Sequence, residues 1–333
     1  MEYYFCSIRG IINAMATDQL ILKHVSGNGK KVNLYGRQLV FTHIHKAAGT
    51  TLSWIADGIA KHRSEETIRL RGTIYGQHVG TNYTEAIDSL RATPPDTLAA
   101  ASFVSGHLAT SAWDEAPVKK PPTFITILRD PVKRMISHFQ FVNIRNEWPS
   151  IVPLDDLVRD GVLVDNLQVR QISGCLDPSE PCTEGMLERA LITLDERYAL
   201  VGLTESFDEM LGTLISSCGW PDIIYSDYQT KKINTEIAKK KLVLDDHQMA
   251  ILSKECSIHN HFDQLMIEEV KGRGDVLVNP RNRDQPPKVD DSVVVVSPMI
   301  RTNNDDFPVF PKKELISFYE WVGQNNNVHL KTI

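Results

Sequence analysis

Apolar runs followed by helical patterns recur along the chain and predict an α/β fold. Residues 39–44 form a short run rich in apolar and β-branched side chains, and Leu52, Ile55, Ala56 and Ile59 then recur at helical spacing. Further buried strands are predicted at residues 98–104, 123–128 and 198–203. We therefore expect a central, mainly parallel sheet flanked by helices in three layers.

Capping signals set the starts of two further helices. Asp130 is a good N-cap, Pro131 suits the first helical position, and an apolar face follows from Val132 to Phe139. Ser206 and Glu209 have the spacing of a capping box at the start of the next helix.

The two ends of the chain carry weaker patterns. Residues 1–37 are interpreted as a peripheral lead-in and residues 38–270 as the main domain. Residues 271–333 are expected to be an irregular extension packed on the same domain. Within this extension, residues 275–312 are rich in Pro, Asn and Asp, the patch 293–296 favours one strand, and a closing helix is predicted through Leu315, Phe318, Tyr319 and Trp321.

Composition narrows the class of protein only slightly. The 333 residues carry a net charge of −6, which gives no reason to expect general nucleic-acid binding. No apolar run is long enough to span a membrane and no secretion signal is evident, so we expect a soluble, cytoplasmic protein without a membrane partner. The sequence carries no signal for an oligomeric state. An odd number of cysteines without a CxxC pair argues against a zinc site or a disulfide framework; these are Cys6, Cys175, Cys182, Cys218 and Cys256.

Residues 45–51 join the first main-domain strand to its helix and have the chemistry of a phosphate site. The start of a helix directs backbone N–H groups and the positive end of the helix dipole at one point. Lys46 adds a charge there, Gly49 allows close approach, and Thr50 and Thr51 add hydroxyl donors. A simple strand–helix connection remains the alternative, and a GxxxxGK[ST] nucleotide loop would place its lysine last rather than first.

Polar residues follow two other strands. His107 comes after the strand predicted at 98–104, and Arg129 directly follows the strand at 123–128, with Ser137 two helical turns further on. Ligands of open parallel sheets gather beyond the carboxyl ends of strands, so these residues are candidates for a site. A structural histidine and a surface arginine are the alternatives.

Three stretches carry a resemblance to sulfotransferases that use 3′-phosphoadenosine 5′-phosphosulfate (PAPS). His45-Lys-Ala-Ala-Gly-Thr-Thr51 resembles their 5′-phosphosulfate loop, and the segment from Arg129 to Ser137 resembles their 3′-phosphate segment. VGLTESFDEML, together with residues 168–175 and Cys182, is similar to the uronyl and heparan sulfate 2-O-sulfotransferase branch. The resemblance covers about residues 38–270 and implies a P-loop-like fold that binds PAPS. The residues it implies for PAPS are Lys46, Ala47, Ala48, Gly49, Thr50, Thr51, Arg129, Ser137 and, from a late basic stretch, Lys231, Lys232 and Asn234.

The same resemblance implies a histidine base. The branch carries His-Gly-His where this chain has Ser105-Gly106-His107, so His107 is the expected general base, beside Lys46 as the second catalytic residue. His45 replaces the usual proline before the lysine, and His43 and His45 are alternative bases. The branch can pair the cysteines that match Cys175 and Cys182, but here we expect free thiols.

The leading hypothesis is therefore a PAPS-dependent sulfotransferase that acts on a hydroxyl, with a saccharide as the expected acceptor. No metal is required, because no ligand cluster is evident in the sequence. One alternative is a P-loop kinase or nucleotide triphosphatase, which would need a lysine followed by Ser/Thr at the helix start and a metal-holding acidic residue. Another is a non-catalytic nucleotide-binding protein.

Overall fold

The fold contains two β-sheets that share a layer of helices. The computed structural model describes residues 20–27, 30, 32–70, 87–116, 118, 121–145, 150–175, 177, 179–226, 242, 244–279, 290–296, 309–323 and 328–333. In the described residues, a six-stranded sheet has the order β3-β4-β2-β5-β6-β8. Its strands are β2 (Leu39–Thr42), β3 (Glu66–Arg69), β4 (Ala101–Gly106), β5 (Thr123–Leu128), β6 (Tyr198–Leu203) and β8 (Val276–Val278).

The pairing in the six-stranded sheet brings three strand ends to one edge. The strands from β3 to β6 pair in parallel, and β8 pairs antiparallel with β6. Thr42, the last residue of β2, is in register with Gly106 of β4 and Thr126 of β5. The loops that follow β2, β4 and β5 therefore meet at the same edge of the sheet.

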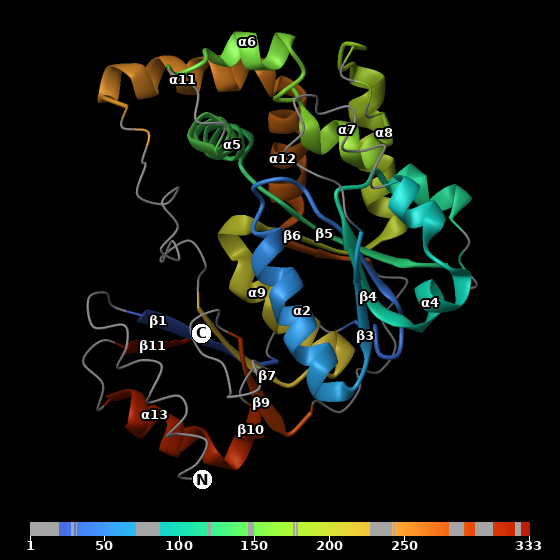
Figure 1. The fold of residues 1–333 in the computed structure, drawn as a ribbon, viewed down its shortest axis with the longest axis vertical. Helices are drawn as coiled ribbons and strands as arrows, with labels where there is room; N and C mark the ends of the chain where they lie inside the picture. The colour runs from blue at the N-terminus through green and yellow to red at the C-terminus, as the bar shows by residue number, and fades with distance from the viewer. Residues whose placement is uncertain are drawn as a thin grey trace.

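A second, five-stranded sheet has the order β10-β9-β7-β1-β11. Its strands are β1 (Leu20–Val25), β7 (Asp222–Ser226), β9 (Ser292–Val296), β10 (Val309–Pro311) and β11 (Val328–Thr332). Successive side chains of a strand point to opposite faces. Val294 and Val296 accordingly belong to the core shared with the six-stranded sheet, whereas Val293 and Val295 pack with Phe318 of α13 (Leu315–Gly323). Figure 1 shows α13 below this sheet.

Two helices fill the space between the sheets. α2 (Gly49–Arg63) and α9 (Phe207–Cys218) contribute their apolar side chains to one core that also contains Ile125 of β5 and Val294 of β9. Both helices lie at the centre of the molecule in Figure 1. The other face of the six-stranded sheet packs on α4 (Pro95–Ala100), α7 (Leu167–Ser173), α8 (Glu184–Arg197) and α12 (His261–Arg273).

A third group of helices stands beyond the strand ends. α5 (Pro131–Arg145), α6 (Leu154–Arg159) and α11 (Asp246–His259) share an apolar cluster at the top of Figure 1. Asp130 accepts a hydrogen bond from the Lys133 N–H at 2.9 Å, which confirms it as the cap of α5. Within the described parts of the chain, no helix is long and apolar enough to cross a membrane.

Several sequence predictions are confirmed and others are wrong. The α/β class is confirmed, and β5 and β6 have the predicted bounds. The P-loop-like arrangement around one central, mainly parallel sheet is not confirmed, since two sheets are present and both contain parallel and antiparallel pairs. The strand predicted at 98–104 is wrong at its start, because Pro95–Ala100 is helical. The predicted capping box of α9 is also wrong, because Ser206 Oγ makes no cap and instead donates to Asp275 Oδ2 at 3.0 Å.

Candidate functional site

The loop between β2 and α2 has a tightly turned backbone. Lys46 has a φ of 65° and Ala48 a φ of 58°, both in the left-handed region that non-glycine residues rarely adopt. Such conformations persist where the surroundings fix them, and they gather at functional sites. Ala47 between them is buried, Lys46 and Thr51 are half-buried, and Thr50 is exposed.

The first residue of α2 is Gly49, and a neighbouring side chain lies too close to this position for any other residue. A Cβ atom at this position would clash with the imidazole ring of His43. The absence of a side chain therefore lets the histidine that follows β2 lie against the start of the helix. This contact fixes the distance between the β2 end and the first N–H groups of α2.

Arg129 joins the loop after β5 to the loop after β2. Its guanidinium Nη1 donates to the carbonyl oxygen of Lys46 at 2.7 Å. The Gln168 side chain holds the Arg129 backbone in turn, because its Oε1 accepts from the Arg129 N–H and its Nε2 donates to the Arg129 carbonyl, both at 2.9 Å. Partial burial lowers the pKa of Arg129, while Glu205 and Asp130 oppose the shift, and the group stays charged at neutral pH. The structure thus brings together the two segments predicted to bind phosphates.

The Lys46 side chain lies against α5. Its Nζ is 4.3 Å from the centroid of the Phe141 ring, the geometry of a cation–π contact. Ser137 is half-buried and lies four residues before Phe141, so the two share a face of α5. The sequence prediction included Ser137 but missed Phe141, because an aromatic residue in an apolar helix pattern gives no signal of its role.

His107 follows β4 and meets the loop after β2. Its Nδ1 lies 2.6 Å from the carbonyl oxygen of His43. A carbonyl has no proton to donate, so Nδ1 carries the hydrogen and Nε2 of the neutral ring is left as the acceptor. The neutral tautomer that this contact selects is the one suited to take a proton at Nε2.

Stacked imidazole rings surround His107. The centroid of the His45 ring is 3.7 Å from that of His107 with an interplanar angle of 7°, and the His43 ring lies at 4.2 Å. His138 of α5 extends the stack, 5.5 Å from His45. The sequence prediction named His43, His45 and His107 separately. It missed His138, because nothing in a helical pattern pairs that residue with a loop before α2.

Burial keeps these four rings neutral. It lowers the pKa of His107 to about 4, even though the hydrogen bond to the His43 carbonyl acts in the opposite direction. Burial first, and then nearby positive charges, lower the pKa of His43, His45 and His138 well below the usual value. At neutral pH the stack therefore consists of uncharged imidazoles beside the cationic Lys46 and Arg129.

The remaining predicted residues are placed as follows. Ser105 is buried in β4, opposite Phe41 of β2. Lys231, Lys232 and Asn234 lie outside the described residues. The end of β7 is described, and its Tyr225 and Ser226 line a small hollow together with Thr50 and Thr51. The chain therefore leaves β7 beside the first turn of α2.

Two further predictions concern cysteines and metals. Cys175 and Cys182 are free thiols, as predicted, and both are half-buried. Burial raises the pKa of the Cys182 thiol to about 11. Among the described residues, no group of three or more His, Cys, Asp or Glu side chains has the arrangement of a metal site.

Comparisons with known proteins bear on this arrangement. The heparan sulfate 2-O-sulfotransferase 1 of Xenopus laevis and that of Homo sapiens are each 21% identical over 192 residues, which cover 52% of this chain and 52% of each relative. This chain is related to heparan sulfate 2-O-sulfotransferases. The Cricetulus griseus enzyme of the same name is 25% identical over 124 residues, 33% of this chain and 35% of the relative.

This relation confirms the resemblance to the uronyl and heparan sulfate 2-O-sulfotransferase branch. The chain spans about half the length of the curated relatives it matches. No protein-family model matches the sequence.

Proposed function

We propose that the chain is a sulfotransferase that transfers a sulfuryl group from PAPS to a hydroxyl of a saccharide. The observation that carries the proposal is the contact between the Arg129 guanidinium and the Lys46 carbonyl at 2.7 Å. It unites the two segments that resemble the donor-binding segments of sulfotransferases. The similarity to heparan sulfate 2-O-sulfotransferases supports the reaction class and a saccharide acceptor. The parallel strands β3 to β6 support the P-loop-like assignment of the fold.

The residues of the loop fit the 5′ end of the donor. The turned backbone from Lys46 to Ala48 leads into the N-terminus of α2, whose N–H groups and helix dipole suit an anion, and the missing side chain of Gly49 lets His43 lie against this helix start. We assign the 5′-phosphosulfate to Lys46, Gly49 and the loop amides of Ala47 and Ala48, with Thr50 and Thr51 as hydroxyl donors. Lys46 would also stabilise the charge that develops on the leaving phosphate.

Arg129 and Ser137 are assigned to the 3′-phosphate. Both belong to the segment that leaves β5 and enters α5, and Arg129 is already oriented by Gln168. Contacts to this remote phosphate help to orient the reacting sulfur. Lys231, Lys232 and Asn234 are assigned to the same nucleotide, since Ser226 at the end of β7 lies beside Thr50 and Thr51.

His107 is assigned as the general base. In the transfer, the acceptor oxygen forms a bond to sulfur, the bond from sulfur to the 5′-phosphate oxygen breaks, and the hydroxyl proton passes to Nε2 of His107. The Nδ1 contact with the His43 carbonyl holds the ring in the required tautomer. A base of this kind contributes about 10²- to 10⁴-fold to the rate.

Transfer from labelled PAPS to a 2-O-desulfated, uronic-acid-containing polysaccharide tests this proposal. His107→Ala is expected to lower the rate by about 10²-fold or more while nucleotide binding is kept. His247→Ala, at an exposed position of α11, is the matched control and should retain the parent rate. Label transfer that does not change in His107→Ala would contradict the role of the base. Phosphoryl transfer from ATP with magnesium would favour the kinase alternative.

The proposal also predicts that the reaction needs no metal ion. Addition of a chelator such as EDTA to the transfer assay is expected to leave the rate unchanged, because Lys46 and Arg129 supply the positive charge at the donor. Loss of activity that returns on addition of magnesium would contradict it.

A further inference from the structure

A cavity lies at the opposite end of β2 and α2 from residues 45–51, the proposed donor loop. It has a volume of about 490 Å³, within the usual range of small-molecule pockets. It is lined by the first residues of β2 and β4, Leu39 and Ala101, and by the last turns of α2. The donor loop comes after the last residue of β2 and runs into the first turn of α2. Ten residues of helix, about 15 Å, separate Gly49 from Ile59 on the cavity wall.

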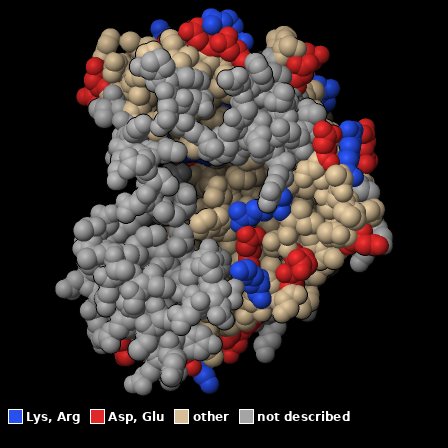
Figure 2. Space-filling view, in the orientation of Figure 1, with Lys and Arg blue, Asp and Glu red and all other residues tan. Residues whose placement is uncertain are grey.

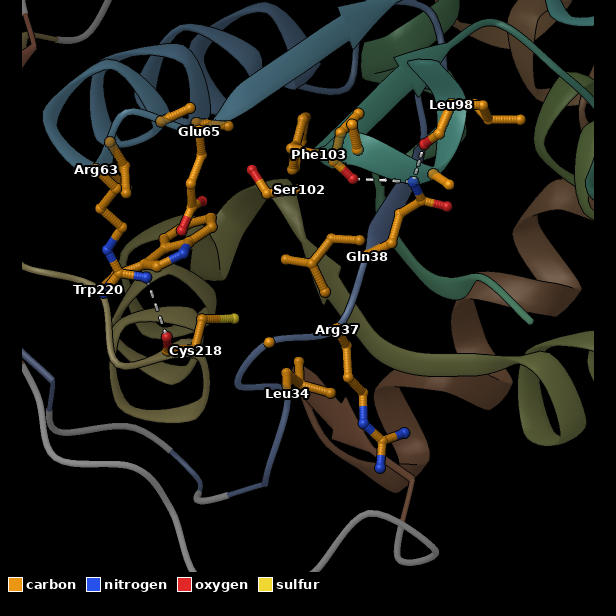
Figure 3. A pocket seen from close by; sticks show the side chains of 18 of the residues that line it. Leu34, Arg37, Gln38, Arg63, Glu65, Leu98, Ser102, Phe103, Cys218 and Trp220 are labelled. Atoms are coloured by element: carbon orange, nitrogen blue, oxygen red, sulfur yellow. Dashed lines mark hydrogen bonds between the residues drawn. The ribbon is translucent and has the colours of Figure 1, made fainter. Parts of the chain in front are cut away.

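The inner wall of this cavity is apolar. It is formed by side chains of the segment before β2, of β2, α2 and β4, and of the end of α9: Leu34, Leu39, Ile59, Phe103, Cys218 and Trp220. Figure 3 shows Arg63, Glu65 and Trp220 on one side of the pocket and Gln38 with Leu98 on the other. The Gln38 carboxamide donates to the carbonyls of Leu98 and Ala101 and so closes that side without presenting a charge. A ligand body in this space would be apolar.

The cavity continues into a polar outer hollow. Gly36, Arg63 and Glu65 line both spaces, and the outer one adds His62, Asp290 and Asp291. The Arg63 guanidinium donates to the carbonyls of Cys218 and Gly219 at the end of α9, so its charge is directed at that helix terminus. Glu65 and Asp291 are exposed. Together, the described lining residues of the two spaces carry three carboxylates, Glu65, Asp290 and Asp291, and two guanidiniums, Arg37 and Arg63, so carboxylates are in excess.

We propose that this cavity binds a small amphipathic amine, with its apolar body between Ile59, Phe103 and Trp220 and its ammonium group beside Glu65 and Asp291. The carboxylates favour a cationic head group, and the apolar inner wall favours an apolar ligand body. The site is separate from the proposed donor site and does not depend on the proposed function.

A matched series of ligands tests the proposal by calorimetry. The compounds 4-phenylbutylamine, 4-phenylbutanol and 4-phenylbutyrate share one apolar body and differ in charge. The amine is expected to bind at a single site, and about fivefold or more tighter than the carboxylate, the range that solvent-exposed ion pairs give. In the double variant Glu65→Gln/Asp291→Asn, the ratio of amine affinity to carboxylate affinity should fall towards one. Equal or tighter binding of the carboxylate to the parent chain would overturn the proposal.

Cavity-filling variants locate the binding. Ala60→Phe and Ala100→Phe each place a ring in the cavity from a different wall, and Ala100 is exposed, so its variant should fold even if the first does not. Each is expected to weaken amine binding at least about tenfold, whereas Ala250→Phe, at an exposed position of α11, should not. Binding that survives both fillings, or no binding to the parent, would overturn the proposal.

A competition experiment separates this site from the donor site. Saturating 3′-phosphoadenosine 5′-phosphate should leave amine binding unchanged, and displacement of the amine would overturn the inference. Failure of the nucleotide itself to bind would contradict the proposed function and leave the result for the cavity intact.

Discussion

At the scale of single residues, the uncharged state of the four stacked imidazole rings has the clearest consequences. His43, His45, His107 and His138 contact one another through ring faces, and each has a lowered pKa because burial disfavours the imidazolium. The stack keeps His107 able to accept a proton at neutral pH. It also makes the folded state sensitive to acid.

We predict that stability falls as the pH is lowered from 7 to 5. The folded-state pKa of His107 is about 4, below its unfolded value of 6.5, so the unfolded chain binds more protons between these values. The stabilisation is complete above pH 6.5 and is lost as the pH falls towards 4. His107 alone accounts for about 2 kcal/mol between pH 7 and 5. Urea unfolding at both pH values measures the loss, and His107→Gln should reduce it. An equal loss in parent and variant would contradict the assignment.

Gly49→Ala is predicted to destabilise the fold and weaken nucleotide binding. The added methyl group meets the His43 ring, and overpacking of this kind costs about 1–3 kcal/mol. Gly272→Ala on α12 is the matched control, because its Cβ meets no atom within 4 Å and alanine favours the helix by about 0.5–1 kcal/mol. Chemical denaturation measures the free energy of unfolding of both variants. A Gly49→Ala variant as stable as the parent would show that the loop relaxes freely.

Sequence patterns singled out the charged residues of the candidate site but not the side chains that surround them. Lys46 and Arg129 each stand at a strand–helix junction, and the parallel register of β2 and β5 brings those junctions together. Phe141 and Gln168 lie on helices whose patterns report only which face is buried. Their roles depend on the packing of α5 and α7 against the strand ends, which no local pattern encodes.

At the scale of elements, α7 and α12 cap each other. The Asn166 Oδ1 accepts from the N–H groups of Phe262 and Asp263 at 2.8 and 3.2 Å. The Asp263 carboxylate accepts in return from the N–H groups of Gln168 and Val169 at 3.2 and 2.7 Å. Because Gln168 also holds the Arg129 backbone, this paired cap connects helix packing to the candidate site.

Asn166→Ala is predicted to cost about 2 kcal/mol of stability. Two helix N–H groups lose their acceptor, and the φ of 43° at this position favours asparagine over alanine. Asp245→Ala removes one exposed cap, that of α11, and should cost about 1 kcal/mol. Unfolding by guanidinium chloride measures the loss of stability in each of the two variants. Equal losses would argue against the paired cap.

Local signals explain which elements were predicted from the sequence. β5 and β6 are continuous buried runs of six residues, and each ends at a helix signal. Residues 98–100 look similar in hydrophobicity, but Pro95 at the first helical position and Asp96 in the first turn begin α4 before the strand. Asp245 forms the full capping box that Ser206 lacks, because Asp275 binds the Ser206 hydroxyl instead.

At the scale of the whole molecule, the five-stranded sheet joins distant parts of the chain. β1 pairs with β7 and β11, and β9 pairs with β7 and β10. Residues from the predicted lead-in, main domain and extension therefore share one sheet. Such pairings over hundreds of residues depend on tertiary contacts, which explains why the sequence patterns gave one patch, 293–296, and not a second sheet.

We predict that these parts unfold together. Phe318 of α13 is fully buried against β9, and Phe318→Ala should cost about 3–5 kcal/mol. Since β9 also packs on α2, the loss should shift one cooperative transition seen equally by circular dichroism and tryptophan fluorescence. Two separated transitions would indicate that residues 271–333 unfold independently.

The most direct test of the central claim is calorimetric titration with 3′-phosphoadenosine 5′-phosphate in the absence of metal. The parent chain is expected to bind it, and both Lys46→Ala and Arg129→Ala should weaken binding by about tenfold or more, since each removes a charged contact to a phosphate. Lys254→Ala on α11 serves as the charge-matched control. No binding to the folded parent, or equal binding to all variants, would contradict the donor site.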